Sequence, residues 1–257
     1  MYKYYYAQVT KGLMTEEQMD IKMAESIIQH EEGVNPEPPM QDPYSLAYYA
    51  DEKIAFEWVK AHYSAPDIYK PQIKEFSELI QENFNSDPLR LNLKKQPSII
   101  EVGCGGGREA PRLSKMFNYL GIDISPAMVS IAKDTNPGIK FQQGDLFNID
   151  LSDKSVDGIF SAAVLHHVLP KALPTALSEL RRIAKDNSIF FSSVREGDPG
   201  QEVTFDEKTG LIYFCQHEST YIPMLNKAGF QSINSSRLTS PGGINYLYNF
   251  SRAIPTK

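Results

Sequence analysis

Residues 98–107, Ser-Ile-Ile-Glu-Val-Gly-Cys-Gly-Gly-Gly, decide the fold of this chain. The first five are mostly isoleucine and valine, with the length and β-branching of a buried strand. Glycines at every second position after the strand remove side chains where a backbone has to approach a ligand closely. Glu101 lies inside the apolar run, where a carboxylate is costly without a partner. A strand that ends in a carboxylate and a glycine loop is typical of nucleoside-cofactor binding in α/β sheets.

Strand-like and helical segments alternate from residue 97 onward. Strands are expected at 98–102, 119–123, 139–142, 157–162, 188–194, 230–234 and 245–252. Helices are expected between the first five strands and after them, at about 107–117, 126–134, 171–184 and 217–228. This alternation predicts a parallel sheet with helices on both faces. A Pro-Gly-Gly turn at 241–243 leaves no helix between the last two strands, so the last strand should run antiparallel.

The first ninety residues have a different character. Apolar residues recur at helical spacing at about 15–32, 51–63 and 71–84, and four prolines make 33–43 an extended link. Tyrosines are dense here and either pack helices over the sheet or form a lid, with Tyr63 and Tyr69 as lid residues. We therefore expect a helical, tyrosine-rich extension at 1–90 and an α/β domain at 91–257.

Polar residues or glycines end the next three strands as well. Asp123 ends the second strand, where a carboxylate can accept hydrogen bonds from both hydroxyls of a ribose. Gly144-Asp145-Leu146 follows the third strand and can meet an adenine ring. Ser161 ends the fourth strand, shortly before a Val-Leu-His-His run at 164–167. Parallel strands bring their carboxyl ends to one edge, so these residues should gather at a ligand site.

These motifs resemble those of the class I S-adenosylmethionine-dependent methyltransferases, over residues 45–257. The family's acidic residue followed by G-x-G-x-G matches 101–107, and its later motifs match the three strand ends just described. The resemblance implies a Rossmann-like, seven-stranded, three-layer α/β/α fold whose last strand is antiparallel. It also implies S-adenosylmethionine as cofactor, S-adenosylhomocysteine as product, and methyl transfer to an oxygen, nitrogen or carbon of a small molecule.

The same resemblance implies the cofactor-binding residues. The glycines would hold the methionine part, Asp123 the ribose, Asp145 and Leu146 the adenine, while Ser161 and Glu101 would meet the ammonium. The full set is Glu101, Gly103, Gly105, Gly107, Asp123, Ile124, Asp145, Leu146 and Ser161. One departure is Lys185-Asp-Asn-Ser188, where the family usually has K-P-G-G before its fifth strand; Asp and Asn can still make that turn.

A narrower resemblance concerns the segment after the fifth strand. Arg195-Glu196-Gly197, followed by Tyr213-Phe214, is similar to bacterial small-molecule methyltransferases of the domain 11/25 type, although the basic residue of the second segment is missing. If functional, Arg195 would hold a carboxylate or phosphate of the acceptor. Otherwise Arg195 and Glu196 would form an ion pair within the loop.

His166 and His167 complete the set of catalytic candidates, because histidine titrates near neutrality and both follow the fourth strand. The alternative for each is a hydrogen-bonded histidine that only caps the loop. A general base is needed only if the acceptor must lose a proton during methyl transfer.

Composition narrows the class of protein. A net charge of −6 over 257 residues disfavours a nucleic-acid partner, because phosphates repel a negatively charged protein; a local basic patch would still permit one. Cys104 and Cys215 have no metal-ligand spacing and suggest reduced thiols in a cytoplasmic protein. No stretch reaches the roughly 20 apolar residues of a membrane span. We expect no metal site, and a monomer or a homodimer.

Three other functions compete with this interpretation. Methylation of a tRNA base or a protein side chain is disfavoured by the acidic charge and because Ser161-Ala-Ala-Val164 stands where N-P-P-Y would bind a planar nitrogen. A non-catalytic cofactor-binding scaffold would not need Asp123 or the glycines. A nicotinamide dehydrogenase would fit the glycine loop but not the reversed last strand.

Overall fold

Seven strands form one sheet in this computed structural model, which describes residues 43–86, 96–198, 200, 203–206 and 209–255. Their spatial order is β3-β2-β1-β4-β5-β9-β8. The strands are β1 (Ser98–Val102), β2 (Asn118–Asp123), β3 (Phe141–Gln143), β4 (Val156–Ala162), β5 (Ala184–Arg195), β8 (Phe230–Thr239) and β9 (Asn245–Ala253). The chain order reverses between β1 and β4, which is the point where open α/β sheets bind ligands.

The first five strands pair in parallel, and β9 is antiparallel to both of its neighbours. The predicted sheet with a reversed last strand is therefore confirmed. The turn between β8 and β9 places Gly243 at φ +80°, a conformation that glycine adopts without steric cost. β9 lies between β5 and β8, so the last strand in the sequence is not at the edge of the sheet.

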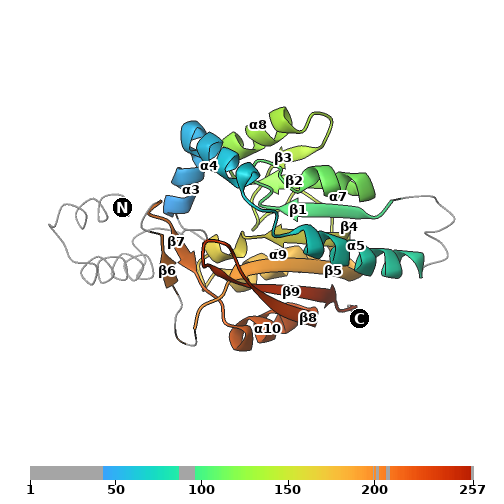
Figure 1. Cartoon of the computed structure of the whole chain (residues 1–257). Helices are drawn as coiled ribbons and strands as arrows, with labels where there is room; N and C mark the ends of the chain where they lie inside the picture. The colour runs from blue at the N-terminus through green and yellow to red at the C-terminus, as the bar shows by residue number, and fades with distance from the viewer. Residues whose placement is uncertain (1–42, 87–95, 199, 201–202, 207–208, 256–257) are drawn as a thin grey trace, which may run out of the picture.

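Helices cover both faces of the sheet (Figure 1). Neighbouring residues of each strand point to opposite faces, so the apolar side chains on both faces need helices to cover them. Ile99 and Phe191 pack with helices α5 (Lys70–Asn85), α7 (Ala110–Met116) and α8 (Pro126–Thr135). Ile100 and Phe190 pack on the other face with α9 (Leu173–Ile183) and α10 (Glu218–Lys227). The three-layer α/β/α architecture expected from the sequence is thus confirmed.

One helix and one hairpin of two strands were not expected. Helix α3 (Pro43–Ala50) begins at a proline that we read as part of an extended link, but proline is compatible with the first turn of a helix. Strands β6 (Val203–Phe205) and β7 (Ile212–Phe214) pair in a small antiparallel hairpin outside the main sheet. Each is three residues long, too short to show a periodicity of its own.

The described helices before β1 pack in two different places. Helix α5 contributes Ile73, Phe76 and Ile80 to one face of the sheet core. Helices α3 and α4 (Glu52–Ser64) instead pack against α8, at the end of the sheet where β1, β2 and β3 finish (Figure 1). The helix expected at 15–32 and the link at 33–42 lie outside the described residues.

Candidate active site

The glycine loop after β1 has a backbone that accepts few side chains. The amides of Gly103 and Cys104 both donate to the Ile122 carbonyl on β2, at 2.8 and 2.9 Å. Gly103 has φ +68°, and a Cβ there would lie 2.1 Å from Cγ2 of Val164. Both the left-handed backbone and the lack of space therefore require glycine at this position.

Gly105 has the least crowded position of this loop. A Cβ at Gly105 would meet no atom closer than Cζ3 of Trp58, at 3.6 Å. Its amide donates to Oδ2 of Asp123 at 2.9 Å, which fixes the loop against the end of β2. The loop and the carboxylate predicted to bind one cofactor are therefore in direct contact.

Asp123 is half-buried and keeps hydrogen-bonding capacity. Its second oxygen, Oδ1, accepts from the Ser125 amide at 2.9 Å. A carboxylate has about four lone-pair positions, and backbone amides of Gly105, Ser125 and Ile124 act on this one, so capacity remains for a hydrogen bond from a ligand hydroxyl. Burial raises the pKa of Asp123, and the hydrogen bonds from backbone amides oppose that shift.

Buried acids gather behind the glycine loop. Glu101 is 2% exposed and accepts a 2.5 Å hydrogen bond from the Tyr119 hydroxyl. Burial, and then the nearby Glu109 carboxylate, raise the pKa of Glu101. Burial likewise raises the pKa of Glu109 to about 7. A cationic ligand at this edge would favour the ionised forms of these acids.

The turn after β3 is tied to the end of β2. The Gly144 amide donates to the Asp123 carbonyl at 3.0 Å, and Gln143 donates to the Ile124 carbonyl at 3.1 Å. Asp145 closes the turn by accepting the Phe147 amide at 2.9 Å. Leu146 is buried in the core, with 4% of its surface exposed. The structure thus brings the residues predicted for ribose and adenine to neighbouring strand ends.

The end of β4 carries backbone strain next to the two histidines. Ser161 is fully buried, and its hydroxyl has no hydrogen-bond partner among the described residues. Ala163 then has φ +58°, which is costly for a residue with a Cβ. One short 3-10 turn, Leu165–His167, follows and sets the positions of both imidazoles.

Both histidines lie in a cluster of aromatic rings. The Tyr213 ring on β7 lies 5.2 Å from His166 and 5.1 Å from His167, centroid to centroid. The Tyr49 ring on α3 lies 5.6 Å from His167, and the Ser45 hydroxyl lies 3.3 Å from its Nδ1. Residues from three distant segments therefore form one site.

The histidines are neutral at physiological pH. Burial, and then the Arg195 guanidinium, lower the pKa of His167 to about 3. Burial lowers the pKa of His166 as well, and its Nδ1 lies 3.3 Å from the Arg195 amide, which donates to it. Imidazoles that resist protonation this strongly are weak general bases at pH 7.

Arg195 and Glu196 diverge after β5. The Arg195 guanidinium stacks over the Tyr213 ring, 3.3 Å from its centroid. Glu196 turns to Arg237 on β8, and its two oxygens accept from Nε at 2.7 and 2.9 Å. The loop ion pair that we considered for Arg195 and Glu196 is therefore absent, and only Arg195 lies with the histidines.

Helices α3 and α4 cover the glycine loop. The Tyr63 hydroxyl donates to the Gly106 carbonyl at 3.1 Å, and the Ser125 hydroxyl donates to the Tyr49 carbonyl at 2.6 Å. Tyr69, the other lid candidate, is buried in the sheet core and contacts the Ser193 hydroxyl at 2.9 Å. Tyr63 thus contacts the site, whereas Tyr69 has a packing role.

Sequence reasoning missed several residues of this site. Asn136 donates to the Gly107 carbonyl at 3.2 Å from the C-terminal end of α8, and no motif marks it. Trp58 was read only as part of a helical pattern. Tyr49 and Tyr213 stood in segments that we singled out, but no role could be given to them before the segments were placed together.

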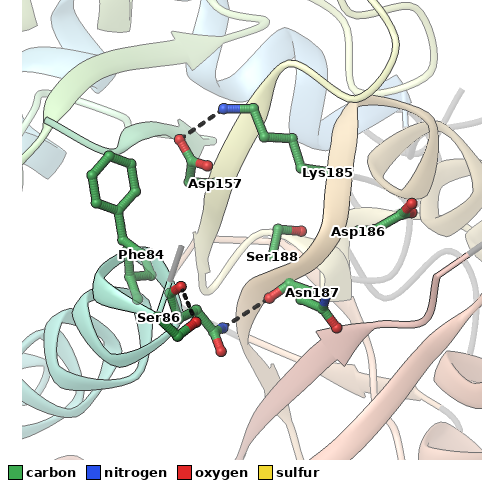
Figure 2. Close-up of a pocket in the computed structure, with 9 residues that line it drawn as sticks. Phe84, Ser86, Asp157, Lys185, Asp186, Asn187 and Ser188 are labelled. Atoms are coloured by element: carbon green, nitrogen blue, oxygen red, sulfur yellow. Dashed lines mark hydrogen bonds and ion pairs between the residues drawn. The ribbon is translucent and has the colours of Figure 1, made fainter. Parts of the chain in front are cut away.

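A separate cavity of about 160 Å³ lies at the opposite edge of the sheet, where β4 and β5 begin. Two of its charged residues form an ion pair: Lys185 donates a hydrogen bond to Asp157 at 2.9 Å, as Figure 2 shows. Asn83 likewise donates to the Asn187 carbonyl at 2.9 Å. Because ligands of open α/β sheets bind at the carboxyl ends of the strands, this cavity is not the cofactor site.

Comparison with known proteins finds similarity to methyltransferases. Residues 100–192 match a family model described as a methyltransferase domain. The chain is 28% identical over 136 residues to the ubiquinone/menaquinone biosynthesis C-methyltransferase UbiE of Campylobacter jejuni, covering 50% of this chain and 54% of that protein. It is 27% identical over 127 residues to the O-methyltransferase cnsE of Penicillium expansum, covering 46% and 45%. The chain spans about half the length of the curated relatives it matches.

A solved structure shares the fold over most of the chain. The 1,6-didemethyltoxoflavin-N1-methyltransferase of Burkholderia thailandensis, solved with 1,6-didemethyltoxoflavin and S-adenosylhomocysteine, superposes with a TM-score of 0.57. The match covers 86% of this chain and 94% of that one at 19% identity, so it speaks for the fold. Within the described residues, no helix is both long and apolar enough to cross a membrane.

Proposed function

We propose that this protein, which carries a class I S-adenosylmethionine-dependent methyltransferase domain, transfers a methyl group from that cofactor to a small-molecule acceptor. One observation carries the proposal: the Gly105 amide binds the Asp123 carboxylate at 2.9 Å, at the carboxyl edge of a sheet whose matched domain is a methyltransferase. That edge, at the reversal of strand order, is the expected ligand site of the fold.

The residues at this edge fit the cofactor in shape and charge. Gly103, Gly105 and Gly107 would cradle its methionine part. All three have a left-handed backbone, which favours glycine, and glycine has no side chain to obstruct a ligand. Asp123 would accept the ribose hydroxyls with its remaining lone pairs. The buried Glu101 would attract the ammonium group.

The adenine and the backbone contacts complete the proposed cofactor site. Asp145, Leu146 and Ile124 would border the adenine at the ends of β2 and β3, and Ser161 would offer its carbonyl to the ammonium. When bound, S-adenosylmethionine supplies an activated methyl group on a sulfonium. The protein then has mainly to align the acceptor and exclude water.

Tyr49, His166, His167, Tyr213 and Arg195 would bind and orient the acceptor. All five lie beyond the ends of β4 and β5, next to the proposed methionine end of the cofactor. Because both imidazoles are neutral, they would act as hydrogen-bonding partners and ring surfaces for the acceptor. His167 remains the first catalytic candidate, since it is half-buried and closest to Tyr49.

Helices α3 and α4 would act as the lid of the proposed site, with α3 contributing to both halves. Tyr49 contacts His167 with its ring, and its carbonyl binds Ser125 beside Asp123. This arrangement would couple cofactor binding to closure over the acceptor. The buried, free thiols of Cys104 and Cys215 fit the reducing cytoplasm that we propose as its compartment.

The acceptor atom stays open in this proposal. The relatives and the fold neighbour are named as methyltransferases acting on carbon, oxygen and nitrogen, respectively. A small molecule is favoured over tRNA by the net charge of −6.

Calorimetry with S-adenosylhomocysteine and with NAD tests the cofactor. We expect saturable binding of S-adenosylhomocysteine and none of NAD; the reverse preference would refute the proposal. Incubation with S-adenosylmethionine and a small-molecule extract then tests catalysis. S-adenosylhomocysteine should accumulate only with extract present, whereas a scaffold protein would bind the cofactor without any accumulation.

A further inference from the structure

We infer that the methyl acceptor is a flat small molecule bearing an anionic oxygen, and that the Arg195 guanidinium binds this oxygen. The inference rests on the proposed function and specifies its substrate class. It follows from the pairing of Arg195, from the rings around it, and from the distribution of charge between the two halves of the site.

No described carboxylate forms an ion pair with Arg195, whereas most described arginines have such a partner. Ion pairs with carboxylates are formed by Arg108, Arg112, Arg181, Arg182 and Arg237. Glu196, its neighbour in sequence, is taken by Arg237. Nε of Arg195 is buried, and no described residue accepts a hydrogen bond from it. A buried donor and an uncompensated charge are costly unless a ligand satisfies them.

The surroundings of Arg195 are aromatic. Tyr213 covers one face of the guanidinium at 3.3 Å, and the Tyr246 hydroxyl is within hydrogen-bonding reach of it. Stacking on one face leaves the N–H edge of the fork for a planar oxygen group. The Tyr49 and His167 rings belong to the same cluster, so we infer a flat ligand that can stack on a ring as well as form hydrogen bonds.

Two carboxylates, Asp206 and Asp123, act electrostatically on rings of this half, on Tyr213 and Tyr49 respectively, but neither forms an ion pair with Arg195. Asp206, which faces Tyr213 electrostatically, accepts the Thr209 amide at 3.2 Å. Asp123 belongs to the cofactor half, where it holds Gly105 and Ser125. The Arg195 charge lowers the pKa of both histidines, after burial, which is the larger cause.

An anionic acceptor also balances the charges of the reaction. The new bond uses an electron pair of the acceptor, and the pair of the broken carbon–sulfur bond stays on sulfur. If the ionised oxygen itself is methylated, both charges disappear and no proton has to be removed. If the anion is a carboxylate elsewhere on the ring, Arg195 only positions the acceptor, and a proton leaves the reacting atom to water. In neither case must a neutral histidine take up a proton.

Binding to the full-length protein saturated with S-adenosylhomocysteine tests the inference. Benzoate and benzamide have the same shape and differ in charge, and 4-nitrophenol can be offered in its neutral or its ionised form by choice of pH. We expect benzoate to bind at least roughly 10-fold more tightly than benzamide, because one charge-assisted hydrogen bond contributes enough free energy for that factor. Preference for ionised 4-nitrophenol over benzoate would point to the reacting oxygen as the anion.

Substitution assigns the preference to one side chain. Arg195→Gln should abolish the preference for benzoate over benzamide, while Arg195→Lys should retain part of it; S-adenosylhomocysteine binding, measured in the same variants, reports that they are folded. Arg252→Gln is the matched control. Arg252 also forms no ion pair with a described carboxylate, but it lies near the opposite edge of the sheet, beside Asn83. It should change nothing.

The outcomes separate the two proposals. Failure of the wild-type protein to bind S-adenosylhomocysteine would refute the proposed function itself. Binding of S-adenosylhomocysteine without any preference for benzoate, including no binding of either probe, would overturn the inference alone. A preference that survives in Arg195→Gln would also overturn it, since the anion would then be held by another group. The wild-type comparison needs no variant, so misfolding of a variant cannot hide the result.

Discussion

The two halves of the candidate site are built by different means and contain ionisable groups of opposite type, acids in one and bases in the other. The cofactor half, around Gly105 and Asp123, consists of backbone amides and buried acids whose pKa values are raised. The acceptor half, around His167 and Arg195, consists of rings and a guanidinium, and the pKa values of its histidines are lowered. The first half is suited to a cationic methyl donor and the second to an anionic acceptor. Each of the following predictions tests one side of this contrast.

Gly103→Ala should have the largest effect, because the glycine loop depends on backbone geometry. A left-handed residue with a Cβ, placed 2.1 Å from Val164, should lose about 2–4 kcal/mol of unfolding free energy in urea titration. Gly138→Ala is the control: Gly138 has φ +87° but nothing within 4 Å of its Cβ position. It should lose only about 1–2 kcal/mol. Equal losses would mean that Val164 moves aside.

Asp123→Ala should weaken S-adenosylhomocysteine binding by roughly 2–3 kcal/mol, or about 30- to 150-fold, because two charge-assisted hydrogen bonds disappear. Isothermal titration calorimetry measures this loss. Asp134→Ala removes an exposed carboxylate from α8 and should leave the affinity unchanged. An affinity that survives Asp123→Ala would remove the ribose role from this residue.

The acceptor half should lose stability in acid. The pKa of His167 is lowered from 6.5 to about 3, so the unfolded chain binds more protons between these pH values. The stabilisation from neutral His167 is complete above pH 6.5 and is lost as the pH falls toward 3. The slope should approach about 1.4 kcal/mol per pH unit for this histidine. Urea unfolding of His167→Gln between pH 7 and pH 5 should show a shallower slope; an identical slope would contradict the burial of this imidazole.

Ala163→Gly should have the smallest effect, and it should stabilise. Relief of a left-handed conformation outweighs the entropy cost of glycine, so a gain of about 0.5–1 kcal/mol is expected. Thermal unfolding measures it. Ala61→Gly, on the exposed side of α4, should instead lose about 1 kcal/mol. A loss in both variants would show that the bend after β4 does not store strain.

Much of the cofactor half could be predicted because its residues follow one another closely. Gly103 and Asp123 belong to adjacent strands joined by one helix, and parallel pairing forces their ends together. Glycine and aspartate are also demanded by the backbone itself, so the motif is visible in the sequence. The exceptions, Asn136 and Trp58, reach the loop with side chains that many sequences could replace.

The acceptor half could not be assembled in this way. Tyr49, His167, Arg195 and Tyr213 come from α3, the turn after β4, the end of β5 and a three-residue strand. The sequence named the histidines and Arg195 as candidates, but it gave Glu196 the same standing. Only the position of Arg237 on β8 draws Glu196 away and leaves Arg195 without a carboxylate.

The resemblance of the motifs to a known family supplied the proposed cofactor, whereas the sequence by itself determined the sheet and its reversed strand. These depend on local periodicity and on backbone positions where few residues are sterically allowed. The tertiary structure alone decided which charges remain uncompensated and which rings meet. Ion pairing and ring stacking depend on distances between segments that are far apart in the sequence, such as those of Tyr49 and His167, and no local pattern encodes those distances.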